Sequence, residues 1–277
     1  MSVKVVTDST ADLPGGLARE LDVTVVPLSV TFGNLSFFDG VDFDADTFYQ
    51  KLQRSVYLPT TSQPATGVFA QVYDGLTDET DEIVSIHISV KLSATINSAL
   101  RGHGAMDKNC HIEIIDSQNA SMGLGLIVIQ AARAAQSGAT LKEVIEVTQE
   151  AITRTHYFGM VDTLEYLHKG GRIGKAKALM GSLLNIKPLI NVCEGEVHPV
   201  GKERTRKKAM ARIQRIVEGF PNIKEMAIAH STVPDDADAF ADRVAFLFNK
   251  DRIYRSRIGP VIGTYLGPGS LAVGIME

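Results

Sequence analysis

Short apolar runs alternate with amphipathic segments along the first part of the chain. Four runs of β-branched and other apolar residues predict buried strands: Val3–Thr7, Val23–Leu28, Ile83–Ile88 and Ile112–Ile115. The segments between them are compatible with helices, and Thr140 followed by Glu143 predicts a capping box at a helix start. This alternation predicts a mainly parallel, doubly wound α/β sheet in the N-terminal part of the chain.

Between the first two strands and the third, turn and loop signals interrupt this order. Proline at residue 14 predicts the start of a short helix through Leu21. Gly33-Asn34 predicts a turn into a small hairpin that ends at Phe38, and Asp44 predicts the N-cap of a helix through Arg54. The segment Leu58–Gly67 carries two prolines and four hydroxyls, so we expect a loop there.

Three polar loops follow predicted strands directly, at Asp8–Thr10, Ser89–Ser93 and Asp116–Asn119. Because the carboxyl ends of parallel strands meet along one edge of a sheet, we expect a ligand crevice at this edge. Ser93 is predicted to be a helix N-cap, where free N–H groups and hydroxyls can hold a small anion such as a carboxylate or a phosphate. The alternative is that Ser93 only caps its own helix.

From Tyr157 onward the pattern changes to hairpins mixed with helices. Strands are predicted at Tyr157–Val161, Ile186–Val192, Val197–Val200, Met226–His230, Ile253–Ile258 and Leu271–Ile275. Helices are predicted at Arg204–Phe220 and Asp236–Phe248, and the glycine-rich segment Gly259–Ser270 predicts a loop that approaches a ligand or another segment closely. We therefore expect two domains: an α/β domain over residues 1–157, and an α+β domain with a mixed sheet over residues 158–277.

Composition limits the kind of protein. The chain has 277 residues, of which 44% are hydrophobic and 22% charged, with a net charge of −4, so we expect a globular protein that does not bind nucleic acid. Cys110 and Cys193 lie far apart without CxxC spacing, which favours reduced thiols and a cytoplasmic location. We expect no signal peptide, and the longest apolar segment, residues 123–132, is too short to span a bilayer and predicts a buried helix.

Motifs that commonly carry chemistry are absent from the sequence. It contains no complete dinucleotide-binding glycine pattern, no P-loop and no G-x-S-x-G serine. The seven histidines show no close pairing, so no metal site is expected, and His87 is predicted to lie in the core. The leading hypothesis is a binding protein without chemistry of its own. The rival is an enzyme that acts on a small phosphorylated or carboxylate metabolite at the Ser93 anion site.

Two basic clusters remain. Lys169–Arg172 is a glycine-rich basic loop, in which Arg172 is free to make bidentate contacts. Several lysines and arginines follow from Lys202 along the polar face of the predicted helix at Arg204–Phe220, where a solvated face is the usual explanation. A third and weaker hypothesis is a regulatory binding module that uses this basic helix.

Six short pieces together resemble the DegV family of fatty-acid-binding proteins, which includes the carrier subunit of bacterial fatty acid kinases. In order along the chain they are Thr7–Pro14, Thr61–Pro64, Lys91–Thr95, Asp116–Ser117, Gly170–Arg172 and Gly263–Tyr265. The resemblance implies a long-chain fatty acid of the palmitate, stearate or oleate type, and no other cofactor. It implies that the acid lies at the domain junction, with residues 1–157 binding the headgroup and residues 158–277 closing the site.

The resemblance also implies roles for individual residues. The hydroxyls of Thr61 and Ser93 would hold the carboxylate, and we expect further headgroup contacts from Ser62, Thr264 and Tyr265. Arg172 would contact a kinase partner that phosphorylates the carboxylate, and we expect Lys169 and Arg204 to contribute to that docking, with transient membrane contact.

One residue departs from the family pattern, because many relatives have histidine where Tyr265 stands. A phenol can donate a hydrogen bond to a carboxylate, but it does not become a cation near neutral pH as histidine can. The expected ligand is physically reasonable without such a cation. Burying about fourteen methylenes at roughly 0.8 kcal/mol each contributes on the order of 11 kcal/mol before costs, so neutral donors need only fix the headgroup.

Overall fold

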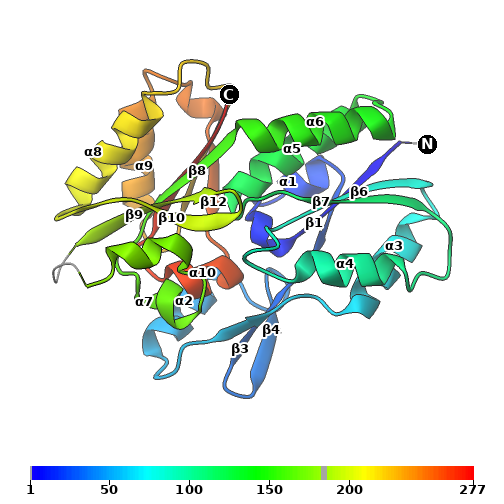
Figure 1. The fold of residues 1–277 in the computed structure, drawn as a ribbon, viewed down its shortest axis with the longest axis horizontal. Coiled ribbons are helices and arrows are strands. Elements are labelled where there is room, and N and C mark those ends of the chain that lie inside the picture. The colour runs from blue at the N-terminus through cyan, green and yellow to red at the C-terminus, as the bar shows by residue number, and fades with distance from the viewer. Residues whose placement is uncertain (1, 182–185) are drawn as a thin grey trace.

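The computed structural model describes residues 2–181 and 186–277, and in this part of the chain it forms three β-sheets (Figure 1). A four-stranded sheet has the order β2-β1-β6-β7 and is parallel throughout. A six-stranded sheet has the order β10-β9-β8-β13-β11-β12 and is mixed, since only β11 and β12 run parallel. The predicted fold class, a parallel N-terminal sheet followed by a mixed C-terminal one, is confirmed.

The third sheet is small and has the order β4-β3-β5. The parallel sheet consists of β1 (Lys4–Asp8), β2 (Val23–Val26), β6 (Glu82–His87) and β7 (His111–Asp116). The small sheet consists of β3 (Ser29–Phe32), β4 (Leu35–Phe38) and β5 (Thr60–Ser62). The mixed sheet consists of β8 (Thr155–Met160), β9 (Lys187–Cys193), β10 (Glu196–Glu203), β11 (Glu225–His230), β12 (Tyr254–Arg257) and β13 (Leu271–Met276).

Ten α-helices connect these strands in the described residues. The first five are α1 (Leu17–Glu20), α2 (Ala45–Arg54), α3 (Thr66–Leu76), α4 (Thr95–His103) and α5 (Met122–Gln136). The others are α6 (Leu141–Arg154), α7 (Glu165–Lys169), α8 (Arg206–Val217), α9 (Pro234–Val244) and α10 (Pro260–Leu266). Short 3-10 turns lie at Ser9–Ala11, Gly174–Leu179 and Lys250–Arg252.

The parallel sheet is covered on both faces, which explains why its strands are almost continuously apolar. Val6 and Ile83 pack against Phe69 of α3, in a core that faces α3 and α4. The neighbouring residues Val5 and Val84 point to the other face and pack in the core that contains α5. Because both faces of such a strand are buried, its sequence is a continuous apolar run and does not alternate between apolar and polar residues.

Helix α5 lies between the parallel and the mixed sheets (Figure 1). It packs against β1 on one side and β8, β11 and β13 on the other, and the prediction of a helix buried over most of its surface is confirmed. Gly125 permits α5 to lie close to the turn at Ser9–Ala11, because a Cβ at this position would lie 2.7 Å from the Ala11 carbonyl oxygen. The mixed sheet is covered on its other face by α8 and α9. The division into residues 1–157 and 158–277 stays a prediction, since α5 packs on both sheets.

Several local predictions are confirmed. The turn at Gly33-Asn34 connects the antiparallel strands β3 and β4. The Asp44 side chain accepts from the N–H of Thr47 and caps α2, and Thr140 and Glu143 form the predicted capping box.

Other local predictions are wrong. The predicted helix from Pro14 is only the single turn of α1. Thr60–Ser62 forms strand β5 by pairing with β3, although prolines on either side favoured a loop. The glycine-rich segment after Gly259 contains α10, because Pro260 at its first position is pre-set for a helix and Val261 and Ile262 are buried. Ser93 is not an N-cap, since α4 begins at Thr95 with Ala94 as its N-cap.

Candidate functional site

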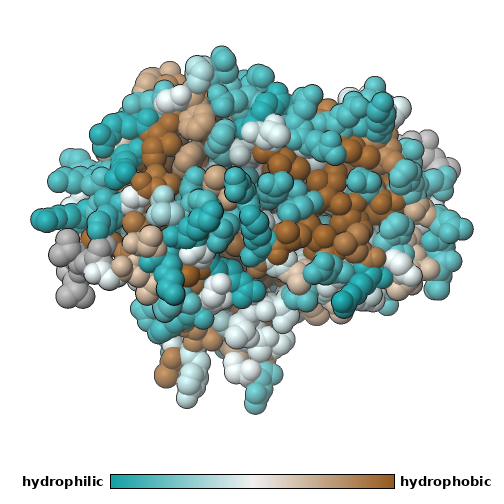
Figure 2. All heavy atoms as spheres, viewed as in Figure 1, coloured by the Kyte–Doolittle hydropathy of each residue, from teal (hydrophilic) through white to brown (hydrophobic). Residues whose placement is uncertain are grey.

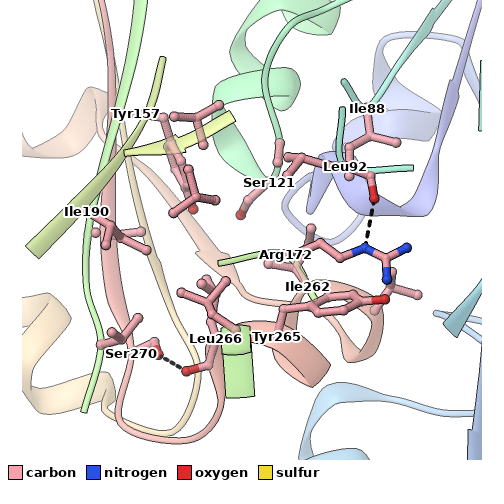
Figure 3. Close-up of a pocket in the computed structure, with 18 of the residues that line it drawn as sticks. Ile88, Leu92, Ser121, Tyr157, Arg172, Ile190, Ile262, Tyr265, Leu266 and Ser270 are labelled. Atoms are coloured by element: carbon pink, nitrogen blue, oxygen red, sulfur yellow. Dashed lines mark hydrogen bonds between the residues drawn. The ribbon is translucent and has the colours of Figure 1, made fainter. Parts of the chain in front are cut away.

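A cavity lies where α10, the mixed sheet and the loop after β6 meet (Figure 3). The space between its lining residues is about 870 Å³, a figure that includes the open space at its mouth. Most of its wall is aliphatic. The larger apolar residues that line it are Leu28, Ile88, Leu92, Met160, Val161, Leu167, Ile190, Val192, Val197, Val261, Ile262, Leu266 and Leu271.

Charge is nearly absent from this wall. Among the described residues that line the cavity, Arg172 is the only one with a charged side chain. An uncharged, largely aliphatic wall suits an acyl chain, whereas the ionised end of an amphiphile needs hydrogen-bond donors or a cation. The polar end of a ligand would therefore lie near Arg172.

Hydroxyl groups gather beside Arg172. Thr61 and Tyr265 line the cavity, and their oxygens share a hydrogen bond of 2.5 Å. Ser93 also lines the cavity, and its Oγ is 2.9 Å from the Oγ1 of Thr95. The structure thus brings Thr61 and Ser93, which are far apart in the sequence, to the wall of one cavity, together with Tyr265.

The loop that carries Ser93 is fixed by the C-terminal part of the chain. The N–H groups of Leu92 and Ser93 donate to the carbonyl of Ser89, and the Ser89 hydroxyl donates to the carbonyl of Gly195 at 2.8 Å. Because Ser93 does not cap α4, its hydroxyl is not committed to the helix backbone. It is available, apart from its contact with Thr95, to a ligand.

Arg172 is held over the mouth of the cavity. Its Nε donates to the Leu92 carbonyl at 3.1 Å and its Nη1 to the Gly170 carbonyl at 2.9 Å. The guanidinium carbon lies 5.0 Å from the centre of the Tyr265 ring, a cation–π arrangement that is visible in Figure 3. A side chain at Gly170 would clash with this ring. The close backbone approach inferred from the glycines beside Arg172 is therefore an approach to Tyr265.

Four other predicted site residues lie outside the cavity wall. Ser62 is exposed, because alternation along β5 points it away from Thr61. Thr264 is buried, and its hydroxyl donates to the Pro260 carbonyl within α10 at 3.0 Å. Lys169 is exposed and pairs with Glu165, and Arg204 is exposed just before α8.

The predicted crevice at the carboxyl edge of the parallel sheet is only partly correct. Residues from the loop after β6, and Ala120 and Ser121 after β7, line the cavity. The loop Asp8–Thr10 does not line it, because Asp8 is buried among its own partners, accepting from the backbone N–H groups of Thr10 and Ile88. His87 lies in the core, as predicted, 2.9 Å from the Asp8 carboxylate.

Two buried carboxyls, which the sequence analysis did not single out, hold the start of helix α10. Asp12 accepts from the N–H of Gly259 at 2.9 Å, and Asp39 accepts from the N–H of Val261 at 3.4 Å. Burial raises the pKa of Asp12 well above its usual range and that of Asp39 to about 7. These carboxyls position the helix that presents Tyr265. Asp12 lies within Thr7–Pro14, one of the pieces that carry the family resemblance, whereas only its place near a turn could have suggested Asp39.

Residues 2–181 and 186–277, the part of the chain that the structure describes, contain neither a metal-ligand cluster nor a membrane-spanning helix. No three His, Cys, Asp or Glu side chains in this part of the chain come together as ligands for a metal ion. No helix there combines the length and the apolar character that crossing a membrane requires.

Comparison with known proteins decides the family. The sequence profile of the DegV family, described as uncharacterised proteins, matches residues 2–277. The chain belongs to the DegV family. A DegV domain-containing protein of Halalkalibacterium halodurans is 38% identical over 276 residues, which are 98% of this chain and 97% of the relative. Protein DegV of Bacillus subtilis is 32% identical over 279 residues, 99% of this chain and 98% of the relative.

Solved structures of DegV-family proteins have the same fold. A DegV family protein from Thermus thermophilus, described by its fatty acid binding, matches with a TM-score of 0.92 at 34% identity over 100% of both chains. DegV from Bacillus subtilis, described as a fatty acid binding protein, matches with a TM-score of 0.90 at 31% identity, also over 100% of both chains.

Proposed function

We propose that this DegV-family chain binds a long-chain fatty acid in the cavity, with the hydroxyls of Thr61 and Ser93 holding the carboxylate. The proposal depends on one observation above all, that Thr61 and Ser93 both line one largely apolar cavity. The two solved relatives that are described as fatty acid binding support the same ligand class.

The chemistry of the wall suits such a ligand. Each buried methylene contributes about 0.8 kcal/mol, so the aliphatic wall supplies most of the affinity. The carboxylate then replaces part of its hydration with hydrogen bonds from Ser93 and from the Thr61 and Tyr265 pair, and with the nearby charge of Arg172. Thr61 and Tyr265 share one hydrogen bond, so one of these two hydroxyls donates to the other and the remaining proton of the pair is free to donate to the carboxylate.

We further propose that the chain presents this carboxylate to a separate kinase and supplies no catalytic group of its own. Thr61, Arg172 and Tyr265 line both the cavity and a surface hollow, which is also bordered by Tyr57 and Lys169. The acid end of the ligand would therefore lie close to a surface that a second protein can reach. Arg172, Lys169 and Arg204 are the docking residues in this proposal.

Exposed apolar residues beside the same hollow support transient membrane contact during loading. Val56 is 90% exposed and Tyr57 is 78% exposed, and both border the hollow. In this proposal the protein works in the cytoplasm, with residues 1–157 binding the headgroup and residues 158–277 closing the site.

Lipid extraction tests the proposed ligand. The purified protein, denatured and analysed by mass spectrometry, should release long-chain fatty acids such as palmitate, stearate or oleate. A protein that carries no lipid and also does not bind added oleate would contradict the proposal.

Matched variants test the proposed carboxylate site. Hydrogen bonds to charged groups contribute about 1.5–3 kcal/mol each, so Thr61→Ala and Ser93→Ala should each weaken oleate binding by roughly tenfold to a hundredfold. Ser62→Ala is the control, because this neighbouring hydroxyl points away from the cavity. Equal affinity for Thr61→Ala and Ser62→Ala would show that the carboxylate lies elsewhere.

A further inference from the structure

A buried phenol on the cavity wall has no partner. Tyr157, on β8, is 5% exposed and lines the cavity; its hydroxyl makes no hydrogen bond of normal geometry to the described residues, although the Ser121 hydroxyl and the Met122 backbone lie close enough to lower its pKa in part. Figure 3 shows the side chain pointing into the cavity, across from the Tyr265 and Arg172 pair. A buried hydroxyl without a partner is unfavourable, so it indicates a group that is supplied from outside the chain.

A serine hydroxyl faces the same part of the cavity. Ser121 immediately precedes α5, and its side chain is drawn near that of Tyr157 in Figure 3. Its hydroxyl donates to the Asp12 carboxyl at 2.6 Å, which leaves the oxygen lone pairs free to accept. The backbone of Ser121, with φ 51° and ψ −142°, is in a region that residues other than glycine rarely adopt, a kind of strain that is common at ligand contacts.

We propose that Tyr157 and Ser121 form a second polar subsite that binds a hydroxyl group on the acyl chain, so that the preferred ligands are hydroxylated long-chain fatty acids. This inference rests on the proposed function, because it needs a fatty acid whose carboxylate lies at Thr61 and Ser93. The chain of such a ligand would run from the Tyr265 end past aliphatic residues such as Ile190 and Leu266.

The donors and acceptors at the subsite match an alcohol. Burial raises the pKa of Tyr157, so the phenol stays protonated and acts as a donor. A ligand hydroxyl can accept from Tyr157 and donate to Ser121 at the same time, whereas a carbonyl can only accept. A plain methylene at this position leaves the phenol without a hydrogen-bond partner. A site built to bind a hydroxyl therefore binds an unsubstituted acyl chain less tightly.

Competition binding to the full-length, delipidated protein tests the inference. The probes are stearate and a series of hydroxystearates with the hydroxyl at successive mid-chain carbons. At least one isomer should bind about tenfold more tightly than stearate, and Tyr157→Phe should abolish this preference while stearate binding is kept. Ser121→Ala, which retains the phenol, should reduce the preference.

Tyr73→Phe is the matched control, because this buried tyrosine bonds to Ser85 outside the cavity and its variant should retain the preference. If stearate binds but no isomer binds more tightly, or if the preference survives in Tyr157→Phe, the inference is wrong. A water that reaches Tyr157 from the neighbouring hollow, which Tyr157 and Asn191 also border, would give the first of these results. If neither stearate nor any hydroxystearate binds the unmodified chain, the proposed function itself fails.

Discussion

Helix α10 separates two polar regions of opposite character. On the cavity side the polar groups are the hydroxyls of Thr61, Ser93 and Tyr265, with Arg172 as the charged residue. On the other side are the buried carboxyls of Asp12 and Asp39, which accept from N–H groups at the start of the helix. The carboxyls are satisfied within the protein, whereas the cavity hydroxyls have capacity left for a ligand.

The carboxyl side of α10 therefore supports the helix, and the hydroxyl side is available to bind a ligand. On the carboxyl side of α10 the N–H groups of Gly259 and Val261 already donate to Asp12 and Asp39, so an acidic ligand is better held by the donors on the hydroxyl side. The space-filling view shows a mixed outer surface with polar and apolar areas, so the general surface gives little guide to such a site (Figure 2). The distinction lies inside the molecule, and substitutions on both sides of α10 can test it.

The largest effect is expected from filling the cavity. A Cβ at Gly159 would meet no atom closer than 3.7 Å, and Gly159 lines the cavity beside Ile190. Gly159→Phe should therefore place its ring in the acyl space and abolish lipid copurification, measured by mass spectrometry, with a folded circular dichroism spectrum. Gly159→Ala, which adds one methyl at ordinary contact distance, should retain the lipid. Retention in both variants would show that the ligand lies elsewhere.

The next effect concerns the carboxyl side. The pKa of Asp39 is raised from 3.8 to about 7, so the native state binds a proton that the unfolded state has lost, and stability falls as pH rises between these values. Asp39→Asn removes this dependence. From pH 4 to pH 8, the free energy of unfolding of Asp39→Asn relative to the unmodified chain should rise by on the order of 4 kcal/mol, measured by urea unfolding.

Asp44→Asn provides the contrasting control, because the Thr47 N–H lowers the pKa of that exposed carboxyl. Its contribution to stability is present above pH 3.8 and is lost as the pH falls further through the lowered pKa, so the free energy of unfolding of Asp44→Asn relative to the unmodified chain should change little from pH 4 to pH 8 and should rise below that range. A parallel response of the two variants would contradict the assignment of a buried, protonated Asp39.

A smaller effect is expected at Arg172. Arg172→Met keeps an apolar stem but removes the charge and the stacking on Tyr265, an interaction of about 1 kcal/mol. Oleate affinity at low salt should fall by about threefold to tenfold, and the affinity should become less sensitive to salt. Isothermal titration at two salt concentrations measures both. An unchanged affinity would assign Arg172 to partner docking alone.

The smallest effect is expected at Lys169 and Arg204, which do not line the cavity. Alanine at either position should change oleate affinity by less than about twofold, because exposed charges away from a ligand contribute little. In an assay with the proposed kinase partner, the same variants should reduce phosphorylation of the bound acid. A large loss of oleate affinity would instead place these side chains at the headgroup.

The sequence was most informative where the physics is local. Continuous apolar runs and capping residues such as Asp44 and Thr140 predict strands and helix starts, because both depend on neighbours in the chain. The strand at Thr60–Ser62 was missed, since its pairing partner β3 supplies what its own proline-flanked segment does not. Helix α10 was missed because glycines concealed its buried apolar residues.

The residues of the candidate site also differ in how far the sequence could predict them. Ser93 was identified from the hydroxyl-rich turn after a predicted strand, whereas Thr61 and Tyr265 were found through the family resemblance. Their shared cavity depends on contacts between distant segments. Ser62 and Thr264 lie in the same sequence pieces as Thr61 and Tyr265. Ser62 points away from the cavity because side chains alternate along β5, and the Thr264 hydroxyl bonds to a carbonyl within α10. Tyr157 gave no signal, because a tyrosine in an apolar run looks like any core residue until the absence of a partner is visible.

The most direct test of the account is a crystal structure of the chain with stearate bound. The account predicts that the carboxylate oxygens lie within hydrogen-bonding distance of Thr61 Oγ1 and Ser93 Oγ, with the acyl chain extending past Ile190 toward Tyr157. A carboxylate bound on the Asp12 and Asp39 side of α10, or an acyl chain outside the cavity, would contradict it.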